Sequence, residues 1–204
     1  MEAINASFVI EDSIDGEEIL KRLERYGRTC YKSEDRITPL SARHFIRMLI
    51  KNGHESVIEH EKVTVRVICD RGVSHEWVRH RIGSYSQEST RYCNYSSGEM
   101  QFIEPIFFKT DAEKYKVWEK TMRVCEEAYN KLLQMGASPQ EARSVLPNSI
   151  KTELVVTYNL REWRHFFRLR CSKRAHPQMR EITVPLLYEF QKRIPVIFDD
   201  IQPE

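Results

Sequence analysis

Valines alternate with polar side chains between residues 62 and 69, where Val63, Val65 and Val67 are separated by threonine and arginine. A period of two places the valines on one face of a strand and the polar residues on the other. The segment therefore predicts a half-buried β-strand. Apolar clusters bounded by turn residues predict two further strands, at residues 5–10 and 153–158.

Apolar residues that recur every three or four positions predict helices in much of the remaining chain. The longest such stripe, within residues 111–135, comprises Trp118, Met122, Cys125, Tyr129 and Leu132. An aromatic and methionine stripe with this spacing is typical of a core face. Shorter helices are predicted from residue 17, across 41–51 and 73–78, from 139, from 160 and across 177–193. In the first two of these, Tyr26, Cys30 and Met48 fall on the predicted apolar face.

Several predicted helices have recognisable boundary residues. Residues 138–141 read Ser-Pro-Gln-Glu, a capping box with proline at the first helical position, and this helix is expected to run as far as Pro147. Asn159 is expected to cap the next helix, with Glu162 completing a second capping box. Pro185 lies inside the last predicted helix. We expect a kink or a break there, because an interior proline costs about 3 kcal/mol.

The composition indicates a globular chain of single-domain size, with 204 residues of which 41% are hydrophobic. Lys and Arg number 32 against 30 Asp and Glu, so the net charge of +2 does not favour a general nucleic-acid-binding surface. No apolar run approaches the ~20 residues of a membrane-spanning helix. Five cysteines without a CxxC pair, and no secretory leader, predict a reduced, cytoplasmic protein.

Residues 79–92 are polar at nearly every position, and Ile82 is the one plainly apolar side chain among them. The stretch begins Arg-His-Arg, passes through Gly83, which we expect to loosen the chain, and continues with hydroxyl, amide and arginine side chains. Guanidinium forks and hydroxyls are donors suited to phosphate. The chain has seven glycines and no GxGxxG or Walker loop, so side chains would have to hold any bound dinucleotide. The stretch predicts a site for a phosphate ester, and the alternative is a solvated, charged loop.

A second cluster of positive charge follows the predicted strand at 153–158. Within fourteen residues, six cations accompany the single carboxylate of Glu162: Arg161, Arg164, Arg168, Arg170, Lys173 and Arg174. Such a one-sided run repels itself unless an anion binds among it, although solvated basic helices also exist. The two clusters together suit one ligand with several phosphates or two phosphorylated ligands.

Two groups of histidines and carboxylates invite comparison with metal sites. They are His54, Glu59 and His60, and His75, Glu76 and His80. His75 and His80 are five residues apart and would point about 140° apart around a helix, whereas helical zinc pairs are spaced by four. We therefore predict that the chain binds no metal.

Several segments resemble the flavin-dependent thymidylate synthases. Arg-His-Arg at residues 79–81, followed by seven residues and Ser89, is the signature of that family. Residues 54–60 read His-Glu-Ser-Val-Ile-Glu-His and are similar to the family segment that lies against the isoalloxazine ring; by itself the segment also suits a capped turn. Residues 142–147 and 159–161 are similar to further ligand-binding segments. The resemblance covers roughly residues 40 to 182.

The resemblance implies an α+β fold in which a mixed central sheet is flanked by helices, as a single catalytic domain over residues 1–204. It implies an enzyme that methylates dUMP to dTMP, with FAD as cofactor and with NADPH and 5,10-methylenetetrahydrofolate as co-substrates. It also implies a cytoplasmic homotetramer with active sites shared between subunits, and no nucleic-acid or membrane partner.

The resemblance also assigns roles to individual residues. Those expected to bind FAD are Ser56, Arg79, His80, Arg81, Gln87, Asn159, Arg161 and His165. Those expected to bind dUMP are Glu76, Arg79, Gln87, Ser89, Arg91, Arg143 and Arg170. Arg170 is expected to be catalytic, because a fixed positive charge at the uracil edge favours loss of the ring N–H proton and makes C5 more nucleophilic. No cysteine nucleophile is then required.

The chain departs from the family pattern at two places. Glu76 stands where a neutral amide can contact the nucleotide, and residues 175–178 read Ala-His-Pro-Gln where Ala-Gln-Trp-Glu is frequent. On the residues alone, two other functions remain open. One is an RNA- or nucleotide-binding module without catalysis that uses the arginine-rich helix. The other is a cysteine-dependent methylating enzyme with Cys93 or Cys171 as the nucleophile.

Overall fold

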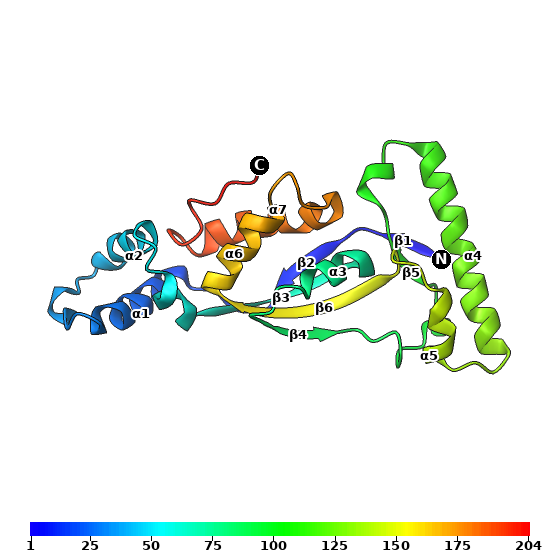
Figure 1. The fold of residues 1–204 in the computed structure, drawn as a ribbon, viewed down its shortest axis with the longest axis horizontal. Coiled ribbons are helices and arrows are strands. Elements are labelled where there is room, and N and C mark those ends of the chain that lie inside the picture. Colours follow the sequence, from blue (N-terminus) through cyan, green and yellow to red (C-terminus); the bar gives the residue numbers. More distant parts are fainter. The chain divides into compact units, whose positions relative to one another are not determined.

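The structure of the chain is a computed structural model that describes residues 1–204, apart from the side chain of Ser97. The strands are β1 (Glu2–Ile4), β2 (Ser7–Ile10), β3 (Lys62–Asp70), β4 (Ser84–Gln87), β5 (Gln101–Ile103) and β6 (Lys151–Asn159). The α-helices are α1 (Gly16–Thr29), α2 (Ser41–Lys51), α3 (Arg71–Trp77), α4 (Ala112–Gln134), α5 (Pro139–Ala142), α6 (Leu160–Arg170) and α7 (Pro177–Arg193) (Figure 1). Short 3-10 helices are η1 (Glu34–Arg36), η2 (Glu55–His60), η3 (Tyr95–Ser97), η4 (Ile106–Phe108) and η5 (Arg143–Val145). The predicted α+β class is confirmed.

Four strands form one sheet in the order β2-β3-β6-β4, and β1 pairs with β5 in a separate parallel ladder. The two strands predicted at residues 62–69 and 153–158 are β3 and β6, which occupy the centre of the larger sheet. The strand predicted at residues 5–10 is shorter than expected, because β2 begins at Ser7 and β1 precedes it. β4 was not predicted, since its residues are polar and belong to the stretch interpreted as a loop.

The contacts of the chain separate into two compact units. Unit 1 comprises Met1–Phe8, Arg66–Arg81 and Tyr85–Val155, and unit 2 comprises Val9–Val65, Ile82–Ser84 and Val156–Glu204. Each strand of the four-stranded sheet contributes residues to both units. That the chain forms one catalytic domain stays a prediction.

The core of unit 2 is an aromatic cluster on α6 and α7. Trp163, Phe166 and Phe167 are fully buried, as predicted, and the Trp163 ring lies 5.0 Å from that of Phe190. The indole Nε1 of Trp163 donates a 3.0 Å hydrogen bond to the carbonyl of Val63 in β3. Helix α6 is therefore fixed against the sheet by both packing and a buried hydrogen bond.

Helix α7 runs through Pro185 without a break, so of the two predicted outcomes the break is wrong and the kink stays a prediction. Pro185 is exposed, whereas Ile182, Leu186 and Leu187 on either side of it are buried. The loss of one backbone hydrogen bond is offset because each of these aliphatic side chains contributes about 1.5–3 kcal/mol on burial.

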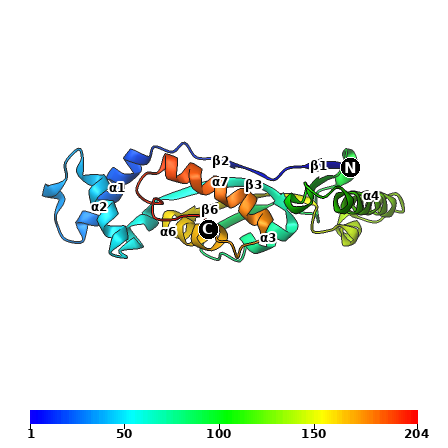
Figure 2. The ribbon, with the colours of Figure 1, turned by 90° about the horizontal axis from the view of Figure 1, so that it is seen from above.

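Helices α1 and α2 pack side by side in unit 2, as both views show (Figures 1 and 2). A Cβ atom on Gly27 of α1 would lie 2.7 Å from the Phe45 ring of α2, so the glycine permits the close approach. The prediction that Tyr26, Cys30 and Met48 share the apolar faces is wrong, because all three are exposed. Only a narrow stripe of each helix is covered, and α1 ends at Thr29.

Helix α4 supplies the core of unit 1. Trp118, Met122 and Tyr129 are buried as predicted, and they pack with Phe102 and Ile150. The capping box at residues 138–141 is confirmed, but α5 ends at Ala142 and the rest of that predicted helix is the separate turn η5. Among the residues that the structure describes, no helix is long and apolar enough to cross a membrane.

Candidate functional site

The Arg-His-Arg segment follows the C-terminal end of α3 in unit 1. Asp70 starts this helix by accepting a 2.7 Å hydrogen bond from the Val73 amide, so the strand β3 leads directly into it. The Tyr85 hydroxyl donates to the carbonyl of His80 and, at 3.3 Å, to that of Trp77. These bonds restrain the backbone at His80, which is buried.

The arginines on either side of His80 point their charge into solvent. Arg79 and Arg81 are both exposed, whereas His80 has only 6% of its surface accessible. The local backbone therefore presents two guanidinium groups from a restrained segment. This is the arrangement that the predicted phosphate-binding role needs, because positioned forks lose less conformational entropy on binding.

Three residues predicted to bind the nucleotide lie close to the short helices α5 and η5 in unit 1. The Nε of Arg91 donates to Oε1 of Gln140 at 3.1 Å, and Nη1 of Arg143 lies 3.5 Å from the Thr90 hydroxyl. The Ser89 hydroxyl accepts the Arg91 amide at 3.3 Å. The tertiary structure thus brings Ser89 and Arg91 together with Arg143, although about fifty residues separate them in the sequence.

Gln87 is held on the sheet between α3 and β6. Its Nε2 donates to the hydroxyls of Ser74, at 2.9 Å, and Thr152, at 3.1 Å. Both hydroxyls are on buried residues, so the orientation of the amide is determined by the fold. Glu76, the other residue expected to contact dUMP beside Arg79, is half-buried on α3.

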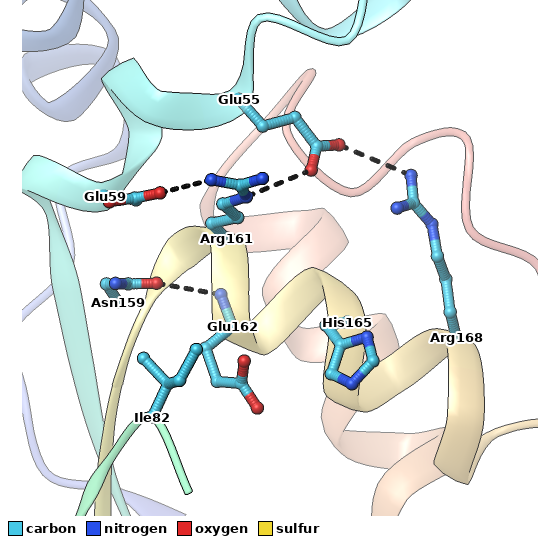
Figure 3. A pocket seen from close by; sticks show the side chains of 8 residues that line it. All are labelled: Glu55, Glu59, Ile82, Asn159, Arg161, Glu162, His165 and Arg168. Carbon is cyan, nitrogen blue, oxygen red and sulfur yellow. Dashed lines mark hydrogen bonds and ion pairs between the residues drawn. The ribbon is translucent and has the colours of Figure 1, made fainter. Parts of the chain in front are cut away.

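In unit 2, a cavity of about 490 Å³ lies beside α6 and η2 (Figure 3). Three predicted flavin-binding residues, Asn159, Arg161 and His165, line it. Ser56 instead lines a neighbouring cavity of about 390 Å³, which shares Arg161 and Glu55 with the first. Arg161 therefore links the two groups of predicted flavin-binding residues.

Asn159 has two functions that its side chain can perform together. Its Oδ1 accepts a 2.8 Å hydrogen bond from the Glu162 amide, which confirms the predicted N-cap of α6. Because only the oxygen is used in the cap, the amide nitrogen remains a donor directed by the same rotamer. The cap therefore orients a potential ligand-binding group.

The chain's own carboxylates neutralise part of the cation cluster on α6. Arg161 Nη1 lies 2.5 Å from Oε1 of Glu59, and Arg168 Nη2 lies 3.6 Å from Oε1 of Glu55 (Figure 3). Arg164 is fully buried and pairs with Asp200. For these three arginines, carboxylates of the chain itself supply the anion that the one-sided run was expected to need. Their partners are distant in sequence, and the helical pattern carried no sign of them.

Glu55, Glu59, Arg168 and Glu162 line the 490 Å³ cavity and were not predicted as site residues. Burial raises the pKa of the Glu162 carboxyl, and the charge of His165 lowers it in part. The spacing of seven between Arg161 and Arg168 places these two side chains on one face of α6, and that spacing was available in the sequence. Glu55 and Glu59 belong to the 3-10 helix η2, and they reach the cavity through tertiary contacts that the sequence did not indicate.

Arg170 is half-buried near the C-terminal end of α6, and its carbonyl accepts a 2.9 Å hydrogen bond from the Thr183 hydroxyl. The next residue, Cys171, is buried, and burial raises the pKa of its thiol to about 11. The thiol is therefore protonated at neutral pH, which does not favour it as a nucleophile.

Unit 1 contains the predicted site residues Glu76, Arg79, His80, Arg81, Gln87, Ser89, Arg91 and Arg143. Unit 2 contains Ser56, Asn159, Arg161, His165 and Arg170. Within each unit the fold gathers side chains from separate segments around polar, partly exposed surfaces. The prediction that no metal binds is untested.

Comparison with known proteins identifies the family. The sequence model of the Thy1 family, described as "Thymidylate synthase complementing protein", matches residues 14–196. The chain belongs to this family. Flavin-dependent thymidylate synthases from Pyrococcus furiosus and Geobacter sulfurreducens are 36% identical over 181 residues and 35% identical over 183 residues. The first alignment covers 87% of this chain and 72% of the relative, and the second covers 86% and 79%.

A solved structure has a fold similar to that of this chain. The UMP/dUMP methylase PolB from Streptomyces cacaoi, bound with 5-Br dUMP, superposes with a TM-score of 0.82 at 24% sequence identity. The match covers 98% of this chain and 96% of that chain. The family resemblance stated from the sequence is therefore confirmed, and so is the fold.

The residues present are compatible with the flavin that the names of the curated Thy1 relatives imply. The 490 Å³ cavity falls in the usual range for small-molecule sites, roughly 300–1,000 Å³. Its amide, guanidinium and imidazole groups are donors for the oxygens of a phosphorylated dinucleotide. The cavity also contains carboxylates, so ligand phosphates would have to compete with Glu55 and Glu59 for Arg161.

Proposed function

We propose that this Thy1-family chain is a flavin-dependent thymidylate synthase that converts dUMP to dTMP. The match to the family model over residues 14–196 carries the proposal, because that range contains every predicted ligand-binding residue. FAD bound at this site and reduced by NADPH would supply the hydride. The carbon comes from 5,10-methylenetetrahydrofolate, which leaves as tetrahydrofolate, while C5 of the uracil loses a proton and gains the methyl group.

Residues of unit 1 hold the nucleotide in this proposal. Ser89, Arg91 and Arg143 bind the phosphate of dUMP, since one hydroxyl and two exposed guanidinium groups lie in adjacent segments. Gln87, with its amide nitrogen engaged by Ser74 and Thr152, offers Oε1 as an acceptor. Glu76 and Arg79 are the other residues of unit 1 that are expected to bind dUMP. The phosphate contacts position the base, while Gln87 and Glu76 select it.

Residues of unit 2 and the Arg-His-Arg segment hold the cofactor. Asn159, Arg161 and His165 bind from the 490 Å³ cavity, and Ser56 binds from the neighbouring cavity that Arg161 also lines. Arg79, His80 and Arg81, together with Gln87, are the contributors expected from unit 1. Guanidinium and amide donors replace the glycine-rich loop that the sequence lacks.

Arg170 polarises the substrate in this proposal. Its positive charge at the uracil edge stabilises the negative charge that develops when the ring N–H is lost, and this makes C5 more nucleophilic. A protein thiol is then unnecessary, and the protonated, buried thiol of Cys171 is consistent with that. The working enzyme is expected to be a cytoplasmic homotetramer in which several subunits contribute to each active site.

The purified protein and its visible absorption spectrum test this function. We expect a yellow protein, or one that becomes yellow with added FAD, whose flavin bands bleach with NADPH under anaerobic conditions. Addition of dUMP and 5,10-methylenetetrahydrofolate should restore the bands and yield dTMP, detected by mass spectrometry. A colourless protein that binds RNA without taking up FAD would support the binding-module alternative. Loss of turnover when Cys93 and Cys171 are both replaced by alanine would support the cysteine-dependent alternative.

A further inference from the structure

Arg164 is a fully buried arginine on α6, with 0% of its side chain exposed. Its Nε donates to Oε1 of Glu55 at 3.0 Å, and its Nη1 donates to the carbonyl of Ile197. Its two terminal nitrogens also form a fork with Asp200, at 2.6 Å to Oδ1 and 2.8 Å to Oδ2. One guanidinium thus joins η2, α6 and the turn that follows α7.

The turn after α7 is held in place by hydrogen bonds of its own. Gln191 of α7 donates its Nε2 to the carbonyls of Phe198, at 3.1 Å, and Ile201, at 2.8 Å. Asp199 accepts the amide of Val196 at 3.2 Å. Asp200 is therefore presented to α6 from a restrained backbone. Its pKa is lowered by the hydrogen bond from Arg164, so it is ionised at neutral pH.

Glu55 and Asp200 share Arg168, which lines the 490 Å³ cavity. Arg168 Nη2 lies 3.3 Å from Oδ2 of Asp200 and 3.6 Å from Oε1 of Glu55. The other oxygen of Glu55 lies 3.8 Å from Nε of Arg161. Arg161, Arg168 and Glu55 line the cavity, whereas Arg164 and Asp200 do not. The buried Arg164 and the half-exposed Asp200 therefore act on the cavity only through its lining residues.

We propose that Asp200 is a positioning residue for the cofactor cavity, acting through Arg164, Arg168 and Glu55. This inference rests on the proposed function, in which Arg161 and its neighbours bind FAD. With Asp200 in place, Arg164 is neutralised by the fork, and Glu55 remains shared among three arginines. Without the Asp200 charge, Arg164 has Glu55 as its remaining carboxylate partner, because a buried guanidinium needs a counter-ion. Glu55 is then drawn towards Arg164, and Arg161 and Arg168 lose their set positions.

The experiment compares FAD affinity in three variants of the full chain, measured by fluorescence quenching of FAD on titration with apo protein. Asp200→Asn keeps the shape and removes the charge, and we expect the Kd for FAD to rise about tenfold, as for loss of a charge-assisted hydrogen bond. Asp200→Glu keeps the charge but displaces the fork, and we expect about a threefold rise. Asp199→Asn is the matched control, because it removes the same charge from the neighbouring residue while retaining an oxygen for the Val196 amide.

A positioning role and a general loss of stability give different results. For Asp200→Asn with saturating FAD, the KM for dUMP should stay within about twofold of wild type. Ser89, Arg91 and Arg143 belong to unit 1, and the backbone of Arg170, the dUMP-binding residue on α6, is held by Thr183. The inference would be overturned if Asp200→Asn and Asp200→Glu bound FAD as tightly as the wild type. It would also be overturned if the Asp199→Asn control lost as much FAD affinity as Asp200→Asn. If Asp200→Asn does not fold, the Asp200→Glu result decides alone. Failure of the wild-type protein to bind FAD would instead contradict the proposed function.

Discussion

At the scale of single residues, identical side chains differ in their exposure to solvent because they have different partners. Arg164 and Arg161 stand three positions apart on α6, yet Arg164 is fully buried in a carboxylate fork and Arg161 is about half exposed. Asn159 was predicted to cap α6, and its 2.8 Å bond to the Glu162 amide confirms it. A cap involves residues three positions apart, so local sequence suffices to predict it. The ion pair between Arg164 and Asp200 joins residues that are distant in the sequence, so the local sequence does not predict it.

Tyr85 is a second residue whose function depends on a specific contact. Its hydroxyl donates to the carbonyl of Trp77, the last residue of α3, and to the carbonyl of His80 in the Arg-His-Arg segment. Tyr85→Phe should therefore lower the free energy of unfolding by about 1 kcal/mol, the usual value of one hydrogen bond. It should also weaken FAD binding, because the segment carrying Arg79 and Arg81 becomes less restrained.

Urea unfolding and FAD titration measure these two effects. Tyr188→Phe is a suitable control, since it removes the same hydroxyl from a tyrosine of α7 that is 53% exposed. Equal FAD affinity in Tyr85→Phe and Tyr188→Phe would contradict a role for the Tyr85 hydroxyl in holding this segment.

At the scale of secondary-structure elements, the polar stretch at residues 79–92 differs most from its prediction. It was interpreted as a loop loosened by Gly83, but it contains the edge strand β4. Gly83 itself is needed for a close approach, because a Cβ atom there would lie 2.3 Å from the ring of Tyr158. A glycine in such a position cannot be told from a flexible one without the neighbouring strand.

Gly83→Ala should consequently destabilise the protein by roughly 1–3 kcal/mol, as expected for overpacking against a buried ring. Gly98→Ala is the matched control: a Cβ atom there meets nothing within 4 Å, and its φ of −171° is open to any residue. The control should stay within about 0.5 kcal/mol of wild type. Thermal unfolding of both variants checks this prediction. Equal melting temperatures would show that the Tyr158 ring can move aside without a loss of stability.

At the scale of the whole molecule, the predicted ligand-binding residues divide between the two compact units. Arg143 and the other nucleotide-phosphate residues belong to unit 1, whereas Arg161 and half of the predicted flavin-binding residues belong to unit 2. A homotetramer with shared active sites, as proposed, would take such groups from different subunits. Symmetric assemblies build composite sites in this way because every subunit contributes the same surfaces.

Mixed oligomers test the shared site directly. Arg143→Ala and Arg161→Ala should each lower turnover by at least about tenfold, since each removes a charge-assisted contact. If one site uses Arg143 of one subunit and Arg161 of another, random mixing should leave about a quarter of the sites intact. Turnover should then recover to about that fraction of wild type after the two variants are unfolded and refolded together. Refolding each variant alone is the control, and no recovery in the mixture would contradict the shared site.

What the sequence by itself determined is local or periodic. The strands β3 and β6, the cap at Asn159, the capping box at residues 138–141 and the family motif all follow from short-range spacing. The α+β class was implied by the resemblance that the motif carries. The tertiary structure decided which charges are neutralised and which remain available to a ligand. Glu55, Arg164 and Asp200 meet from three distant segments. Electrostatic energy depends on the distance between charges and their exposure to water, and only the folded chain sets those two quantities.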